Sequence, residues 1–203
     1  MPLNRSGPGA PGGDAAPRLI LLNGAPAVGK STLARRYAED RPLALVLDLD
    51  VLRRMLGRWR DDPGAAGLRI RSVAAAAARE HLAARYDVVV PQLVGRVEFI
   101  ERLAAVAAEA GARFHEVYVL DDAASVVQRF AERTRAAAEP AHVEAHELLA
   151  GGDDALREWH GVVERLAAER PHAVAVASVP GDVEATYRAL LAAIGADPER
   201  IGT

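Results

Sequence analysis

The chain has 203 residues, of which half are apolar and only 4% aromatic, and its formal net charge is −3. This length predicts one domain that buries a large core made mostly of small aliphatic side chains. The lack of cysteine excludes disulfides, thiolate catalysis and cysteine-based zinc sites. The lack of a basic block argues against nucleic acid as the main partner, and no apolar stretch approaches the roughly 20 residues that span a bilayer.

The N-terminal segment, residues 1–17, is rich in glycine and proline and has no hydrophobic signal core. This composition is typical of a disordered tail and not of a targeting peptide. We therefore expect a cytoplasmic protein whose single domain covers residues 18–203, with no membrane or obligate protein partner.

Five short apolar runs alternate with segments of helical length along the chain. The predicted strands are residues 18–23, 43–48, 86–91, 113–120 and 173–177, and the predicted helices include 31–38, 51–59, 68–85, 97–110 and 183–194. Turn residues at 61–67 predict a break in the chain. This alternation predicts an α/β fold, a five-stranded parallel sheet with helices on both faces.

A long segment lies between the fourth and fifth predicted strands, at residues 129–170. Its part from 137 to 170 is charged and alanine-rich, with Gly151-Gly152 as a candidate hinge. The segment is longer than an ordinary connection between elements, and such segments commonly close over active sites. We therefore predict a helical lid insertion at residues 137–170.

The only lysine of the chain, Lys30, lies in the motif Gly24-Ala25-Pro26-Ala27-Val28-Gly29-Lys30-Ser31-Thr32. This motif fits the phosphate-binding pattern G-x-x-x-x-G-K-[ST] at every specified position. A compact ammonium group can enter a loop of backbone amides, which a planar guanidinium cannot do. Because the motif follows an apolar strand and opens a helix, its amides and the helix dipole point to one place. We interpret it as a nucleotide-binding P-loop and not as a chance glycine-rich turn.

Two acids, Asp48 and Asp50, follow the second predicted strand, at the sheet edge where ligands of parallel sheets bind. A carboxylate there can accept a proton from a hydroxyl group that attacks a terminal phosphate, or it can help to hold Mg²⁺. We assign Asp50 as the base and Asp48, with Ser31, as the metal ligand, although the reverse assignment is open. The alternative is that Asp50 only caps the helix beginning at Val51, which would leave Asp48 unexplained.

Two arginines, Arg129 and Arg133, are four residues apart and share one face of a helix after the fourth strand. Their guanidinium groups can stabilise the negative charge of a transferring phosphoryl group, or they can simply pair with neighbouring glutamates in solvent. Gln92, after the third strand, is either a substrate contact or an ordinary loop amide.

The pattern from Arg18 to Ile194 resembles the small P-loop phosphotransferases of the chloramphenicol phosphotransferase and zeta-toxin group. Residues 24–32 match the Walker A motif of these families, and residues 46–53 are similar to their second-strand segment. In that segment an aspartate about twenty residues beyond the loop lysine serves as the base, and Asp50 takes that place. The chain lacks a further substrate-binding segment of the zeta toxins, and its 137–170 segment is more elaborate than in the drug kinases.

The resemblance implies a nucleoside-monophosphate-kinase-like fold that uses ATP and Mg²⁺. The leading hypothesis is transfer of the γ-phosphate to a hydroxyl group of a small molecule such as an antibiotic, a sugar or a nucleoside. The alternatives are a zeta-toxin-like sugar-nucleotide kinase and an ATPase or switch module that acts through a protein partner. Such modules usually have a strand ending in aspartate after the loop, whereas the third strand here ends in Pro91-Gln92.

Overall fold

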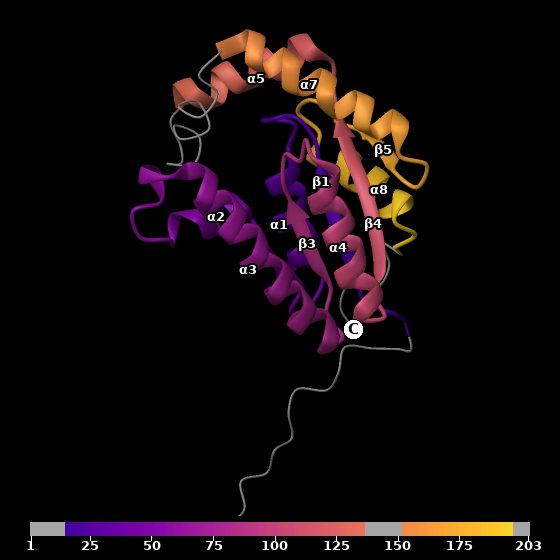
Figure 1. Ribbon diagram of the computed structural model, residues 1–203. Helices are drawn as coiled ribbons and strands as arrows, with labels where there is room; N and C mark the ends of the chain where they lie inside the picture. The colour runs from indigo at the N-terminus through magenta and orange to yellow at the C-terminus, as the bar shows by residue number, and fades with distance from the viewer. Residues whose placement is uncertain (1–14, 137–151, 197–203) are drawn as a thin grey trace, which may run out of the picture.

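The computed structural model describes residues 15–136 and 152–196, and its centre is a five-stranded parallel sheet in the order β2-β3-β1-β4-β5 (Figure 1). The strands β1 to β5 are Arg18–Asn23, Leu45–Val46, Val88–Pro91, Arg113–Leu120 and Val174–Ala177. The predicted fold class is confirmed. Because β1 lies between β3 and β4, the phosphate loop that follows β1 leaves the middle of the sheet.

Helices cover both faces of the sheet (Figure 1). The helices are α1 Lys30–Glu39, α2 Leu49–Arg54, α3 Pro63–Ala83, α4 Val97–Glu109, α5 Ala123–Ala136, α7 Gly152–Glu169 and α8 Val183–Ala193, and a 3-10 turn spans Trp59–Asp61. Helices α3, α4 and α7 pack on one face, and α1 and α8 pack on the other.

The position of β1 in the middle of the sheet explains why its sequence is a continuous apolar run. Leu19 and Leu21 point into the core beneath α3 and α4, whereas Ile20 and Leu22 point into the core beneath α1 and α8. All four side chains are fully buried. A parallel strand that is covered on both faces needs apolar residues at every position, so it shows no polar alternation.

The segment between β2 and α3 differs from the prediction in three ways. Strand β2 has only two residues and lies at the edge of the sheet, and Leu43 shortly before it adopts a left-handed conformation (φ 59°). Helix α2 begins at Leu49, and not at Val51, with Asp48 as its N-cap. The predicted break at 61–67 is wrong, because α3 already begins at Pro63.

The start of α3 shows why a Pro-Gly sequence did not interrupt the chain. Asp62 is the N-cap, and its carboxylate accepts a hydrogen bond from the amide of Ala65 at 2.9 Å. Proline lacks an N–H, but the first turn of a helix needs no N–H at this position, and the fixed φ of proline suits it. The same residues that signal a turn therefore form a helix start once an aspartate precedes them.

Residues 1–14 of the predicted tail (residues 1–17) lie outside the described residues. Residues 15–17 are described and are part of the fold. Pro17 is buried, and its carbonyl accepts a hydrogen bond from the amide of Arg113 at 2.8 Å. The carbonyl of Ala15 accepts one from the guanidinium of Arg85 at 3.0 Å. The boundary of the tail at residue 17 is thus too late. In the part of the chain that the structure describes, no helix has the length and apolar character needed to cross a membrane.

The predicted lid, residues 137–170, is only half described, because residues 137–151 lie outside the described residues. Its second half is mainly α7, which packs against β4 through Val163, Leu166 and the fully buried Tyr118. Arg170, just after α7, forms ion pairs with Glu101 on α4 at 2.8 Å and with the buried Glu116 on β4. This half of the segment therefore contributes buried side chains to the core, in spite of its charged and alanine-rich sequence.

Candidate active site

The phosphate loop has the backbone that its glycines predict. Gly29 is the N-cap of α1 with φ 97°, a left-handed conformation that favours glycine. Gly24 is held for a different reason, because a Cβ on it would lie 2.5 Å from the carbonyl oxygen of Val119 and 2.9 Å from Val28. Ala27 also has a positive φ of 67°. Successive residues in such conformations turn their amides inward and form an anion-binding concavity.

The ammonium group of Lys30 lies over this loop. It donates hydrogen bonds to the carbonyl oxygens of Gly24 at 2.9 Å and Ala25 at 2.7 Å. These contacts place the charge of the ammonium group at the mouth of the loop, next to the start of α1. The position is the one that the motif predicts for a lysine that binds phosphates.

Asp48 lies beside the phosphate loop, and its two carboxylate oxygens have different tasks. Oδ1 caps α2 by accepting hydrogen bonds from the amides of Asp50 at 3.0 Å and Val51 at 3.2 Å. Oδ2 accepts a hydrogen bond from the hydroxyl of Ser31 at 3.2 Å. A hydroxyl and a carboxylate side by side, near phosphate oxygens, are the few hard ligands that Mg²⁺ takes from proteins. Ser31 and Asp48 therefore fit a magnesium site.

Asp50 lies in the first turn of α2, with its carboxylate 3.1 Å from the guanidinium of Arg53. Burial raises the pKa of Asp50 above its ordinary value, Arg53 lowers it and the neighbouring Asp48 raises it. Because 47% of the side chain still contacts water, we expect the carboxylate to be ionised at neutral pH. It is therefore able to accept a proton.

Arg53 connects Asp50 to the ring of Trp59. Its guanidinium lies over the ring of Trp59 at 4.7 Å, and Arg60 lies over the same ring at 4.6 Å. Trp59 is buried at the edge of the core. Arg53 therefore links α2 to the 3-10 turn. Asp50 is held in place by its ion pair with Arg53 as well as by its own helix.

Gln92 follows β3 directly and points into the same region. Its Nε2 donates a long hydrogen bond of 3.4 Å to the carbonyl of Leu93. Its Oε1 is buried and has no hydrogen-bond partner among the described residues. A buried amide oxygen without a partner is costly, and the contact of Gln92 with a substrate stays a prediction.

Asn23, at the end of β1, connects two loops of the site, and sequence reasoning missed it. Its side chain is fully buried; its Oδ1 accepts hydrogen bonds from the amides of Gly24 at 2.8 Å and Val94 at 2.9 Å. Its Nδ2 donates to the carbonyl of Val94 at 2.9 Å. Asn23 therefore ties the phosphate loop to the loop after β3. The signal available in the sequence was a single polar residue at the end of an apolar strand.

Arg129 lies away from Asp50, on the side of the phosphate loop that faces β4 and β5. Its guanidinium forms an ion pair with Asp121 and donates to the hydroxyl of Ser178 at 3.1 Å. Ser178 in turn donates to the carbonyl of Val28 at 3.2 Å. The contact of Arg129 with a transferring phosphoryl group stays a prediction. Arg133 lies on α5, but its side chain is outside the described residues.

Most of the residues described above line one cleft, which has a volume of about 810 Å³. The phosphate loop, Asp48, Asp50 and Gln92 form one part of its lining, and Arg129 is not among its described lining residues. Helices α2 and α3 add Arg53, Arg54, Gly64, Gly67, Leu68 and Arg71, while the β3–α4 region and α7 add Val94, Gly95, Arg96, Phe99 and Trp159. The cleft has space for a triphosphate and a second small molecule.

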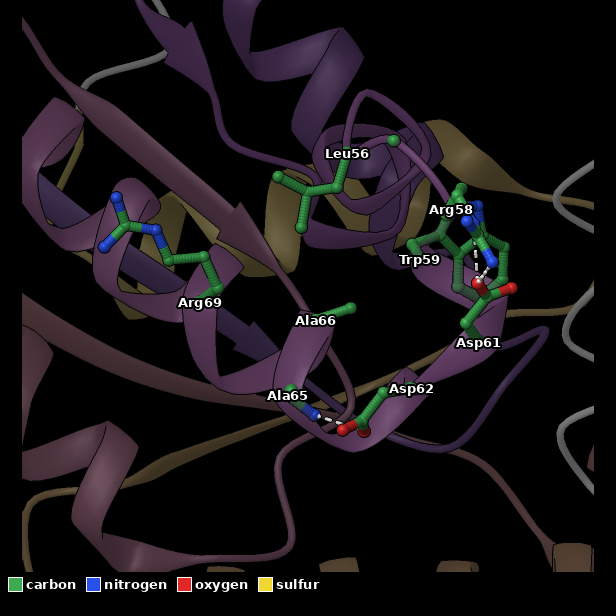
Figure 2. Close-up of a pocket in the computed structure, with 9 residues that line it drawn as sticks. Leu56, Arg58, Trp59, Asp61, Asp62, Ala65, Ala66 and Arg69 are labelled. Atoms are coloured by element: carbon green, nitrogen blue, oxygen red, sulfur yellow. Dashed lines mark hydrogen bonds and ion pairs between the residues drawn. The ribbon is translucent and has the colours of Figure 1, made fainter.

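A second pocket of about 340 Å³ lies between the turn that contains Leu56 to Asp62 and the start of α3 (Figure 2). Three of its four charged lining residues are engaged with one another or with the backbone, since Arg58 pairs with Asp61 at 2.6 Å and Asp62 caps α3. Trp59 lines this pocket, whereas Trp159 lines the main cleft. We place the active site in the larger cleft, because it contains the phosphate loop and both acids.

Comparison with known proteins gives one family. Residues 19–155 match the family described as "AAA domain", which is more than half of the chain. No curated protein matches.

Solved structures with similar folds include three that the chain covers almost completely. A gluconokinase from Sinorhizobium meliloti is 20% identical with a TM-score of 0.59, and the alignment covers 89% of this chain and 93% of that one. A putative kinase from Chloroflexus aurantiacus is 17% identical with a TM-score of 0.61, covering 88% and 99%. A tunicamycin resistance protein from Deinococcus radiodurans is 15% identical with a TM-score of 0.53, covering 89% and 97%.

These identities are low, so the structures establish a common fold. The resemblance to P-loop phosphotransferases is thereby confirmed at the level of the fold, and the narrower chloramphenicol phosphotransferase and zeta-toxin group stays a prediction. The chain belongs to the AAA domain family of P-loop proteins and has the fold of the small P-loop kinases.

Proposed function

We propose that the protein is an ATP-dependent phosphotransferase that moves the γ-phosphate to a hydroxyl group of a small molecule. Membership in the AAA domain family supports ATP as the nucleotide. The observation that carries the proposal is the cleft itself, in which the phosphate loop and Asp50 face one space that continues past the nucleotide site. An enzyme that only hydrolyses ATP needs no such second compartment.

Each group of the site has a task in the proposed reaction. The loop amides and Lys30 bind the β- and γ-phosphates, and Asp50 accepts the proton of the acceptor hydroxyl as its oxygen attacks the γ-phosphorus. The bond between the γ-phosphorus and the bridging oxygen breaks, and ADP leaves. Ser31 and Asp48 would hold Mg²⁺, which neutralises phosphate charge when bound.

The proposed reaction gives the arginines of α5 one task, which is to contact the γ-phosphate as it is transferred. Arg129 is already paired with Asp121, so a contact with the γ-phosphate requires this ion pair to exchange for phosphate oxygens. The lid predicted at residues 137–170 would have to exclude water during this exchange, because water in the site would hydrolyse ATP; its first part, residues 137–151, lies outside the described residues.

The second candidate is an ATPase or switch module that acts through a protein partner. The contact between Ser31 and Asp48 is compatible with it, because a carboxylate near the phosphate-loop serine serves magnesium in either function. The kinase is favoured since Asp50 and Gln92 line the cleft together with the phosphate loop.

The test is ADP release in the presence of a panel of hydroxyl compounds that includes sugars, nucleosides, aminoglycosides, chloramphenicol and a sugar nucleotide. We expect one class to stimulate release and to appear as a phosphorylated product by mass spectrometry. Lys30→Ala should abolish turnover, and Asp50→Asn should lower it by roughly 10²–10⁴-fold with near-normal ATP affinity. Asp61→Asn, an exposed acid of the second pocket, serves as the control. Release that ignores every acceptor and tolerates Asp50→Asn would establish the ATPase instead.

A further inference from the structure

The main cleft carries an excess of positive charge. Six of the 25 basic residues of the chain line it, but only two of the 28 acidic residues do. Since the formal net charge of the whole chain is −3, this excess is local. The basic residues are Lys30, Arg35, Arg53, Arg54, Arg71 and Arg96, and the acidic residues are Asp48 and Asp50.

The nucleotide and the catalytic acid account for part of this charge. Lys30 belongs to the phosphate loop, and Arg53 is paired with Asp50. Arg71 and Arg96 differ from them, because they come from α3 and from the loop between β3 and α4. Neither has a carboxylate partner among the described residues, and the described contact of Arg71 is with the ring of Phe99.

Arg96 occupies a position where an arginine is unfavourable for the fold. It is the N-cap of α4, and its side chain makes no capping hydrogen bond. Short polar side chains are preferred at an N-cap, and a cation at the positive end of a helix dipole is destabilising. An anion held between the arginine and the first turn of the helix would offset both effects.

Arg71 reaches the same first turn of α4 from the neighbouring helix. Its guanidinium lies 5.7 Å from the centre of the Phe99 ring, and Phe99 follows Arg96 by three residues. Phe99 is buried and lines the cleft. Arg71 and Arg96 therefore both line the cleft around the start of α4.

We infer that the acceptor carries an oxyanion, either a carboxylate or a phosphate ester, in addition to the hydroxyl group that receives the phosphate. This inference rests on the proposed function. Arg71 and Arg96 bind the oxyanion, since a guanidinium offers two parallel donors to carboxylate or phosphate oxygens. The hydroxyl group of the same molecule then faces Asp50, and neutral sugars and neutral antibiotics are poor acceptors.

The test measures binding of three compounds with one carbon skeleton: glycerol, glycerate and glycerol 3-phosphate. Each is titrated by calorimetry into protein saturated with Mg²⁺ and a non-hydrolysable ATP analogue, so that the phosphate loop is already occupied. We expect one or both anions to bind at least tenfold more tightly than glycerol. Arg71→Gln and Arg96→Gln should each weaken the anion about tenfold or more, whereas affinity for the ATP analogue should not change.

The matched control is Arg69→Gln, which removes the same charge from α3 but lines the second pocket. It should leave anion binding unchanged, and Arg71→Lys should restore part of the affinity lost in Arg71→Gln. Equal binding of glycerol and both anions, or equal losses in Arg69→Gln and Arg96→Gln, would overturn the inference. Tighter binding of a short 5′-hydroxyl oligonucleotide than of either small anion would also overturn it, in favour of a nucleic-acid acceptor. The proposed function is tested separately by ADP release, so either can fail alone.

Discussion

At the scale of single residues, the structure separates two acids that the sequence presents as a pair. Asp48 caps α2 with one oxygen and accepts from Ser31 with the other. Asp50 makes no cap and instead pairs with Arg53 in the cleft. The interpretation that Asp50 is merely the helix cap is therefore wrong, and the assignment of Asp50 as base and Asp48 as metal ligand stays a prediction.

Asp48 allows its two tasks to be measured separately. Asp48→Asn keeps an oxygen that can cap α2 but loses charge at the metal site, so we expect near-normal stability with a raised Mg²⁺ requirement. Asp48→Ala loses the cap as well, which costs about 1 kcal/mol and lowers the midpoint of thermal unfolding by roughly 2–4 °C for a chain of this size. Mg²⁺ titrations of turnover and thermal unfolding curves check the pair. Equal unfolding midpoints for the two variants would contradict the capping role.

The pKa of Asp50 predicts a pH dependence of turnover and of stability. Burial raises this pKa, so the folded chain binds the proton more tightly than the unfolded chain does. The contribution of Asp50 to stability therefore falls as pH rises through the window from the unfolded pKa to the raised folded one. Turnover should rise as pH passes through the raised folded pKa and level off above it, because the base must be ionised. In Asp50→Asn the acidic limb of the pH–rate profile should disappear, and the variant should unfold no more easily than the parent at pH 7.

At the scale of elements, the cleft depends on a close contact between α7 and the loop before α4. A Cβ on Gly95 would lie 2.4 Å from Cζ3 of Trp159, so the indole ring would have to shift to accommodate any other residue there. Trp159 is 37% exposed and lines the cleft. The tryptophan is thus part of the wall of the site and not of the core, and it connects α7 to the loop that carries Arg96.

Gly95→Ala should displace Trp159 and destabilise the protein by about 1–3 kcal/mol, the usual cost of overpacking. Gly161→Ala is the matched control in α7, where an added Cβ meets only the flexible Arg165 at 3.4 Å. It should stabilise the protein by about 0.5–1 kcal/mol, because glycine is unfavourable inside a helix. Urea unfolding measures both, and the fluorescence of Trp159 in a Trp59→Phe background reports its displacement. A Gly95→Ala variant with parental stability and fluorescence would show that the contact is not tight.

At the scale of the whole molecule, the site is assembled from segments that lie far apart in the sequence. The phosphate loop after β1, the acids before and in α2, Gln92 after β3 and Trp159 on α7 meet at one cleft. They meet because β1, β2 and β3 are parallel neighbours, so their carboxyl ends lie at the same edge of the sheet.

Hydrogen exchange tests the packing of α7, which is the main described part of the lid predicted at residues 137–170. We expect α7 to exchange slowly in the free protein, because Leu156, His160, Val163 and Leu166 are buried on its packed face. Fast exchange of α7 in the free protein would contradict its packing.

Several elements were predictable from sequence because their signals are local. The phosphate loop has a fixed spacing of glycines and lysine, and the bounds predicted for β1 and β4 agree with the structure. The start of α3 was missed because Pro63 and Gly64 act as turn residues only when no N-cap precedes them. The packing of α7 was missed because its apolar residues are spaced at helical intervals among many charges. Only the folded structure shows that these residues cover the face of β4 that carries Tyr118.

The sequence by itself determined the P-loop, the α/β class and the presence of two acids about twenty residues beyond Lys30, since each depends on neighbours along the chain. Only the tertiary structure decided which acid caps α2, that Arg129 is held by Asp121 and Ser178, and that Arg71 and Arg96 line one cleft. The physical reason is that charges and hydrogen bonds act through space, over a few ångströms. Some of the residues that line this cleft lie more than one hundred positions apart along the chain.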